Sequence, residues 1–258
     1  MSWPELYVWI TLEGGTMNRQ NYASGPVGTQ QLRGGTRSRR PVGTLPFRYL
    51  RRAAVPVGVR PATRWTGQIC PIVLTDITAF SAHRRSDEDR LTLRRTMYDM
   101  LQRAFEAAGL AWQRLHKEDR GDGTLIVIPP DTPASAVTAR ALGHLAAALR
   151  RHNQTASDAL RMQLRVALHA GPVIRDAQGV TGHAINQTAR LIQARILRKN
   201  LDETQADLGV IVSAYIYDNV IRQHEGQPMD ATLYRKIRFQ VKESALTAWI
   251  RLTGAASE

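Results

Sequence analysis

Residues 69–77, ICPIVLTDI, form a largely apolar run with an aspartate, Asp76, as its next-to-last residue. A short apolar run rich in β-branched residues is typical of a buried strand. The segment Ser86 to Asp89 follows it and has the composition of a helix N-terminus. The helix is expected to continue to about Ala108 and to end at Gly109. Its buried side is predicted to carry Leu93, Met97, Leu101 and Phe105.

After this first strand and helix, strands and helices continue to alternate to the end of the chain. The element order up to residue 170 is βαββαβ, which predicts an α+β fold with a ferredoxin-like sheet and C-terminal helix and strand additions. The tight turn at 120–123 should join two strands as a hairpin. Strands are expected at 112–117, 124–128, 162–170, 210–213, 235–241 and 245–252. Helices are expected at 132–151, at 182–199 and from the end of the strand at 210–213 to about 223.

The first 66 residues differ in composition from the rest. They contain ten arginines against two glutamates and are dense in Gly, Pro, Ser and Thr, so they account for most of the net charge of +13. We therefore predict a disordered basic segment at 1–66 and a single folded domain at 67–258. Two origins for the segment remain open: a nucleic-acid-binding arm, or a start codon placed too far upstream.

The remaining composition narrows the class of protein. Cys70 is the sole cysteine in the sequence, so neither a disulfide framework nor a cysteine-rich zinc site is expected, and a reducing cytoplasm is the predicted setting. No apolar run approaches the roughly 20 residues of a membrane helix. We expect a soluble cytoplasmic protein with no membrane partner, and nucleic acid is a less favoured partner because the excess charge lies mostly outside the domain.

Two aspartates are predicted to meet at one edge of the sheet. In a βαββαβ sheet the first and third strands are antiparallel neighbours, so Asp76 at the end of one should lie beside Asp122 at the start of the other. Paired carboxylates are the hard oxygen ligands that Mg²⁺ or Mn²⁺ requires. The alternative is that Asp76 caps a helix entry and Asp122 only serves the turn.

Two further segments have the composition of a nucleotide site. The backbone N–H groups of 77–81, ITAFS, which include that of Phe80, could hold phosphate oxygens. Asn186 and Arg190 lie four residues apart on one helix and so share a face, where they could orient a ribose and stabilise phosphate charge. Taken alone, this second pair is equally consistent with a solvated polar stripe.

Together these motifs resemble the class III nucleotidyl cyclases over about residues 69 to 252. LTDITAFS resembles the first metal motif of that family, RVALHAGPV at 165–173 its strand before the substrate loop, and GHAINQTAR at 182–190 its G-x-x-[VI]-N-x-x-x-R motif. The resemblance implies that Asp76, Asp122 and the Ile77 carbonyl bind two Mn²⁺ or Mg²⁺ ions. It gives Asn186 the ribose-orienting role, Arg190 the transition-state role and Lys242 a phosphate-binding role.

The resemblance also implies a homodimer with composite sites. In this family the two aspartates come from one subunit and the Asn, Arg and Lys from the other, and this chain carries both halves. The implied reaction converts a nucleoside triphosphate into a 3′,5′-cyclic nucleotide by two-metal catalysis.

The nucleobase is less clearly defined. Glu118, four residues before Asp122, resembles the base reader of guanylate cyclases, but the second reading position is Gly179, so neither purine pattern is complete. The stretch EDRGDG also resembles the pyrimidine cyclases of Pycsar anti-phage systems, which favours UTP as substrate, cyclic UMP as product and a cyclic-nucleotide-activated effector as an indirect partner. Alternatively, Glu118 is a structural partner of Arg120 or Lys117.

The sequence disfavours three other classes of protein. An RNA-binding ferredoxin-like module would need exposed aromatic residues on its middle strands, and GTLIVIP at 123–129 supplies none. A degenerate cyclase acting only as a sensor is disfavoured because both aspartates and the Asn/Arg pair are present. A diguanylate cyclase would need a GG[DE]EF turn, which the sequence lacks.

Overall fold

The computed structural model describes residues 65–224, 231–241 and 244–254. The chain divides into two units, Met1–Val57 and Gly58–Glu258, and all described residues belong to the second. The predicted disordered segment therefore lies outside the described residues, apart from Trp65 and Thr66, and so does Lys242.

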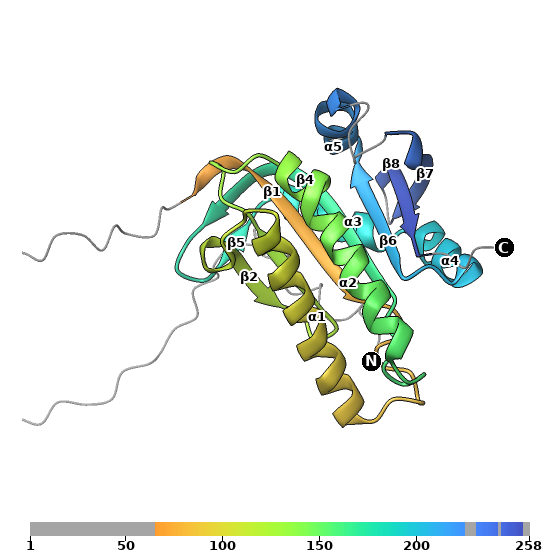
Figure 1. Cartoon of the computed structure of the whole chain (residues 1–258). Coiled ribbons are helices and arrows are strands. Elements are labelled where there is room, and N and C mark those ends of the chain that lie inside the picture. The colour runs from red at the N-terminus through yellow and green to blue at the C-terminus, as the bar shows by residue number, and fades with distance from the viewer. Residues whose placement is uncertain (1–64, 225–230, 242–243, 255–258) are drawn as a thin grey trace, which may run out of the picture. The chain divides into compact units, whose positions relative to one another are not determined.

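One eight-stranded sheet organises the described unit (Figure 1). The strands run in the order β2-β3-β1-β4-β6-β8-β7, with β5 paired to β4. The long central pair β1 and β4 is antiparallel, while β4 and β6 are parallel. The strands are β1 (Thr66–Ile77), β2 (His116–Asp119), β3 (Gly123–Val127), β4 (Leu164–Arg175), β5 (Val180–Thr181), β6 (Leu208–Ser213), β7 (Arg235–Val241) and β8 (Ser244–Thr253).

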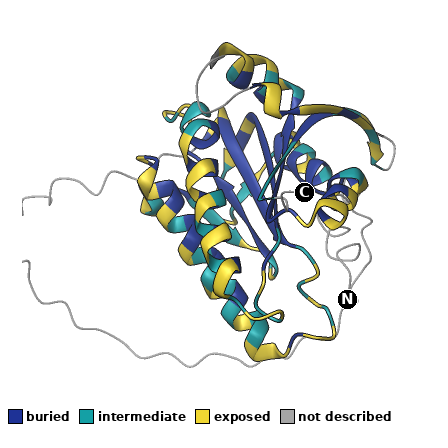
Figure 2. Cartoon of the chain, turned by 45° about the vertical axis from the view of Figure 1, so that its right-hand side comes forward, coloured by how far each residue is buried: buried dark blue, intermediate teal, exposed yellow. Residues whose placement is uncertain are grey.

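Helices cover both faces of the sheet. Because strand side chains alternate between faces, Val73 and Ile77 join the core beneath α1 and α2, whereas Asp76 points to the opposite face. There α3 packs on β4 so closely that a Cβ on Gly171 would lie 2.7 Å from that of Ala184. Figure 2 shows the buried sheet between helices that expose their outer sides. The helices are α1 (Asp87–Ala107), α2 (Leu142–Thr155), α3 (His183–Ile192), α4 (Arg195–Thr204) and the short α5 (Ala214–Ile216).

The first helix forms as the sequence predicts. Ser86 caps it through a hydrogen bond from the Asp89 N–H, and the Asp89 carboxylate accepts from the Ser86 N–H in return, a complete capping box. The helix gives way to Gly109, whose φ is +82°. The four residues predicted for its apolar side are all buried: Leu93, Met97, Leu101 and Phe105.

One predicted element was wrong in type and another in continuity. Residues Trp112–Arg114 form a 3₁₀ turn and not a strand. The Trp112 ring packs edge-on against the Phe105 ring, with 5.8 Å between the ring centroids, and Lys117 Nζ donates to the Trp112 carbonyl. The expected helix at 182–199 is two helices. It breaks at Ala194, which is fully buried, and an arginine side chain from β4 takes the Ile192 carbonyl.

The expected helix at 132–151 was also shifted. Its first regular α-helical residue is Leu142, it extends to Thr155, and one π-helical turn, Val137–Ala141, precedes it. Thr138 lies in that turn and bonds back to the Ala134 carbonyl, a pattern that loosens a helix start.

Candidate active site

The two predicted metal aspartates do meet. Asp76 lies opposite Gly123 in the β1–β3 register, and the Ile77 N–H donates to the Asp122 carbonyl at 2.8 Å. The Asp122 side chain also acts to lower the pKa of the Asp76 carboxyl, so the two side chains are near neighbours. The sheet edge therefore presents two adjacent carboxyl groups, as the antiparallel pairing predicts.

Gly123 allows the two strands to approach this closely. A Cβ at this position would lie 1.8 Å from the Thr75 carbonyl oxygen, a distance at which two atoms overlap. No residue with a side chain fits there unless β1 and β3 separate. The glycine after Asp122 is therefore required by packing, in addition to any turn preference.

Asp76 is buried and charge-paired. Its side chain is 7% exposed, and the Arg165 guanidinium, 9% exposed, donates to its Oδ2 from Nε at 2.6 Å and also from Nη2. Burial raises the pKa of the Asp76 carboxyl, and the charges of Arg165 and the more distant Arg198 oppose that rise. The negative charge of Asp76 is therefore partly compensated by Arg165.

The donor set at this edge fits a magnesium-type ion. Two carboxylates and the neighbouring Ile77 carbonyl are hard oxygen donors, and Mg²⁺ commonly takes one or two carboxylates and completes its shell with substrate phosphates and water. Within the described ranges no cluster of three or more His, Cys, Asp or Glu side chains could hold an ion by itself. The residues therefore suit a metal that arrives with a phosphorylated ligand and not a closed structural site.

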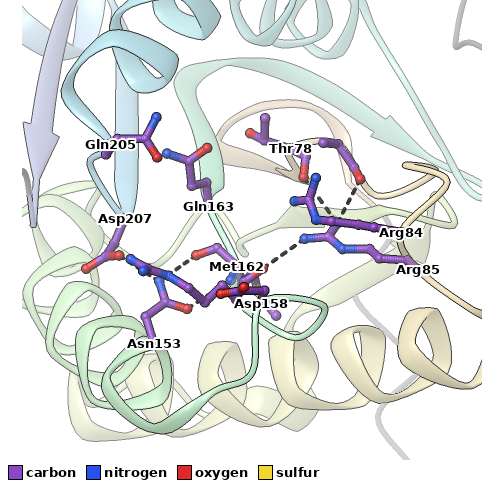
Figure 3. A pocket seen from close by; sticks show the side chains of 11 residues that line it. Thr78, Arg84, Arg85, Asn153, Asp158, Met162, Gln163, Gln205 and Asp207 are labelled. Carbon is purple, nitrogen blue, oxygen red and sulfur yellow. Dashed lines mark hydrogen bonds between the residues drawn. The ribbon is translucent and has the colours of Figure 1, made fainter.

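The loop after β1 is fixed by a second buried arginine. Arg85, 3% exposed, donates to the carbonyls of Thr78 and Ala79 in the loop, at 3.3 and 2.8 Å. Across the loop it donates to the Ala159 and Arg161 carbonyls at 3.1 and 2.8 Å. Figure 3 shows the Arg85 side chain where the loop, labelled at Thr78, meets the segment before β4, labelled at Asp158 and Met162. Ala79 is held at φ +53°, which is unusual for a residue with a side chain.

The expected phosphate cradle is smaller than predicted. The Ile77 N–H is taken by the Asp122 carbonyl and the Thr78 N–H by the Gln163 carbonyl. The N–H groups of Ala79, Phe80 and Ser81 donate no hydrogen bond within the described chain, so they remain as possible phosphate donors. The Phe80 side chain packs against the hydrophobic core, so its contribution would come through the backbone.

Beside this loop lies a polar cleft of about 310 Å³. Figure 3 shows it between the β1–α1 loop, the end of α2 and the start of β6. At its floor Asn153 Nδ2 donates to the Asp207 carboxylate at 2.6 Å and to the Met162 carbonyl at 2.8 Å. The lining carries charges of both signs, including Arg84, Arg161 and Asp158, and no charge of one sign dominates it.

The two predicted base-reading positions also lie together. A Cβ on Gly179, whose φ is +140°, would sit 2.9 Å from Glu118 Oε1. Both carboxylate oxygens of Glu118 are engaged: His116 Nε2 lies 2.9 Å from Oε1, and Arg120 donates to Oε2 at 2.6 Å. The alternative structural role, a pairing of Glu118 with Arg120, is thus present, while Lys117 is directed elsewhere, onto backbone carbonyls.

The second polar motif lies on α3. Ala184, Ile185, Thr188 and Ala189 face the sheet, which leaves Asn186 exposed and Arg190 half-buried on the outer side of the helix. The helix approaches the acidic edge through its last carbonyl, that of Ile192, which accepts from Arg165 Nη1 at 3.2 Å. Lys242, the remaining predicted residue, lies outside the described residues.

Sequence reasoning missed the two buried arginines. Arg165 opens RVALHAGPV, and a charge among otherwise apolar strand residues could have indicated a buried partner. Arg85 adjoins Arg84 in a polar loop and gave no such signal. Arg84 is exposed and Arg85 is not, a difference that only the tertiary contacts create.

Comparisons with known proteins identify solved structures that share this fold. No family model and no curated protein matches the sequence. Among solved structures, an adenylate/guanylate cyclase/hydrolase from Silicibacter pomeroyi matches with a TM-score of 0.52 at 17% identity, covering 72% of this chain and 97% of that one. A bacterial light-regulated adenylyl cyclase matches with a TM-score of 0.50 at 14% identity, covering 74% and 92%.

The chain therefore has the α+β fold of cyclase catalytic domains. No helix in the described part is both long and apolar enough to span a membrane. Cys70 is fully buried, and burial raises the pKa of its thiol to about 11, so it is not a reactive thiolate near neutral pH.

Proposed function

We propose that this chain is a class III nucleotidyl cyclase that converts a nucleoside triphosphate into a 3′,5′-cyclic nucleotide and pyrophosphate. The observation that carries the proposal is the meeting of Asp76 and Asp122 at one sheet edge in a cyclase-type fold, beside a fixed loop whose N–H groups at 79–81 donate no hydrogen bond within the described chain. Paired carboxylates next to backbone donors suit a metal-bound triphosphate.

Each residue then has a definite task. When bound, Mg²⁺ or Mn²⁺ supplies charge neutralisation for the triphosphate and lowers the pKa of the ribose 3′-hydroxyl. Asp76, Asp122 and the Ile77 carbonyl hold the ions, and the N–H groups of residues 79–81 bind phosphate oxygens. From a second copy of the chain, Asn186 orients the ribose, Arg190 stabilises charge on the reacting phosphate and Lys242 binds the phosphates.

A homodimer with two composite sites follows from this assignment. It is supported by the outward position of Asn186 on α3 and by two large apolar residues left exposed on neighbouring strands, Ile69 on β1 at 54% and Ile174 on β4 at 49%. Each subunit would complete the site of the other. A fully active monomer in analytical ultracentrifugation would contradict this part of the proposal.

For the base we propose a pyrimidine, with UTP as substrate and cyclic UMP as product. Gly179 contributes no side chain beside Glu118, and both Glu118 oxygens already have partners, so the position lacks the free polar groups of a purine reader. The biological role that goes with this reading is antiviral signalling in a Pycsar-type system. A separately encoded effector activated by the cyclic nucleotide would then respond in the cytoplasm.

The test is product analysis by mass spectrometry with Mn²⁺ and each of ATP, GTP, CTP and UTP. We expect a cyclic pyrimidine nucleotide from the wild-type protein and a loss of about 100-fold or more in turnover for Asp122→Ala. Asp119→Ala is the matched control, because Asp119 lies on the same hairpin but pairs with Arg94 at the surface. It should stay close to wild type.

The outcomes separate the parts of the proposal. A cyclic purine would keep the cyclase and overturn the pyrimidine and defence assignments. No product from any triphosphate, or full turnover by Asp122→Ala, would overturn the cyclase assignment itself.

A further inference from the structure

Arg165 occupies the same carboxylate that the proposed metal needs. Its Nε and Nη2 both donate to Oδ2 of Asp76, and both side chains are buried. A guanidinium and a divalent cation that share one buried carboxylate repel each other at low dielectric, so each weakens the binding of the other. The ion pair and metal ligation at Asp76 therefore compete.

The Asp76 carboxylate already has a cationic partner, Arg165, without a metal. Asp76 and Asp122 supply two carboxyl groups, and Arg165 and Arg198 are the cations whose fields act on Asp76. A carboxylate that is already paired attracts a further divalent cation weakly. A metal that arrives with a triphosphate brings its own anionic charge, so it can displace the arginine without leaving an excess of positive charge.

We propose that Arg165 is a positioning residue that competes with divalent metal for Asp76, so that the metal binds tightly only together with nucleotide. This inference rests on the proposed function. Arg165 keeps Asp76 compensated in the free protein and releases it when the metal–nucleotide complex arrives.

The third contact of Arg165 gives the exchange a structural consequence. Nη1 donates to the Ile192 carbonyl at the C-terminal end of α3, where a cation is favoured by the helix dipole. The same side chain therefore joins Asp76 to the helix that carries Asn186 and Arg190. When Oδ2 goes to the metal, the contact with Ile192 remains available to hold the displaced arginine.

The test measures Mn²⁺ affinity without nucleotide, by electron paramagnetic resonance titration of the full chain. We expect Arg165→Met and Arg165→Gln to bind Mn²⁺ about tenfold or more tightly than wild type, because the competing charge is gone. Arg165→Lys keeps the charge and should stay near wild type. If Arg165→Met does not fold, Arg165→Gln carries the test, since its amide can still bond to Asp76 and Ile192.

A second comparison adds a non-hydrolysable triphosphate. In wild type it should strengthen Mn²⁺ binding strongly, whereas in Arg165→Gln the gain should be much smaller, because binding without nucleotide is already tight. Arg198→Met is the matched control: Arg198 is exposed and acts on Asp76 only through its field, so its loss should change Mn²⁺ affinity much less.

Failure of this inference differs from failure of the proposed function. Unchanged or weaker Mn²⁺ binding in both Arg165→Met and Arg165→Gln, with Asp76→Asn still abolishing it, would overturn the competition while leaving the metal site in place. Mn²⁺ binding that is insensitive to Asp76→Asn and Asp122→Asn would overturn the metal site and the competition with it.

Discussion

Two buried arginines at the same end of the sheet solve the problem of a buried charge in different ways. Arg85 directs its donors onto four backbone carbonyls, and Arg165 directs two of its donors onto one carboxylate. Backbone carbonyls have no other cation to bind here, so Arg85 holds the two loops together permanently. We call this set of contacts the fixed joint. A carboxylate can accept another cation, so the Arg165 region can change state. The partner decides whether a buried guanidinium is structural or exchangeable.

The largest expected effect comes from removing the fixed joint. Arg85→Gln should lower the free energy of unfolding by about 4 kcal/mol. The shorter amide cannot reach all four buried carbonyls, so most of them lose their charged hydrogen-bond donor. Urea denaturation measures this. Arg84→Gln, at the exposed neighbour, should change stability by no more than about 0.5 kcal/mol. Equal effects of Arg85→Gln and Arg84→Gln would contradict the structural role given to Arg85.

The next effect tests the exchangeable region. Arg165→Gln should lower stability by about 3 kcal/mol in metal-free buffer, since two adjacent carboxyl groups lose their compensating charge. Added Mn²⁺ should recover part of this loss, because a ligand that binds the native state stabilises it. Arg85→Gln should gain no such recovery beyond that of wild type. The measurement is thermal unfolding of each variant with and without Mn²⁺.

A third buried basic side chain, that of His169, stays neutral near neutral pH. His169 on β4 is 7% exposed, its Nδ1 lies 2.8 Å from Ser213 Oγ, and burial together with nearby His183 lowers its pKa to about 4. In the unfolded chain its pKa is near 6.5, so between about pH 6.5 and 4 the unfolded state binds more protons. Stability should therefore fall as the pH falls through this window, by up to about 3 kcal/mol.

The histidine prediction is checked by denaturation at pH 7.5 and pH 5. His169→Gln should flatten the loss of stability between the two conditions, while His83→Gln, at an exposed position, should follow wild type. A wild-type slope that persists in His169→Gln would assign the acid sensitivity to other groups.

The smallest effect concerns the helix that starts beside Arg85. Ser86→Ala removes the cap of α1 and should cost about 1 kcal/mol. Thermal unfolding of Ser86→Ala and Ser86→Asp should separate the cap from other roles, because Asp can cap in the same way. A loss as large as that of Arg85→Gln would mean that the loop is held by the helix start and not by the arginine.

The sequence predicted most of what depends on periodicity and strand pairing. Asp76 and Asp122 were expected together because antiparallel neighbours bring one strand end to the other strand start, and their register confirms it. The apolar face of α1 followed from its spacing in the same way. These features depend on local pattern and on topology, both of which a single sequence records.

What the sequence could not predict depends on contacts between distant segments. The break at Ala194 arises because Arg165, far away in sequence, takes the Ile192 carbonyl and buried packing holds Ala194. The burial of Arg85 but not Arg84 depends on the carbonyls of Ala159 and Arg161. The reduced phosphate cradle follows from Gln163, whose carbonyl takes the Thr78 N–H. No spacing rule contains these pairings.

The pairing of the two longest strands also determines when the acidic edge can form during folding. Asp76 and Arg165 are separated by 89 residues, so their contact must wait until β4 has docked on β1. Such non-local closure is slow compared with the formation of α1 or of the β2–β3 hairpin. In a nascent chain Asp76 would meet Asp122 before it meets Arg165, so the carboxyl pair is uncompensated until the central sheet is complete. The late arrival of this one arginine makes the docking of β4 on β1 the step that neutralises the site.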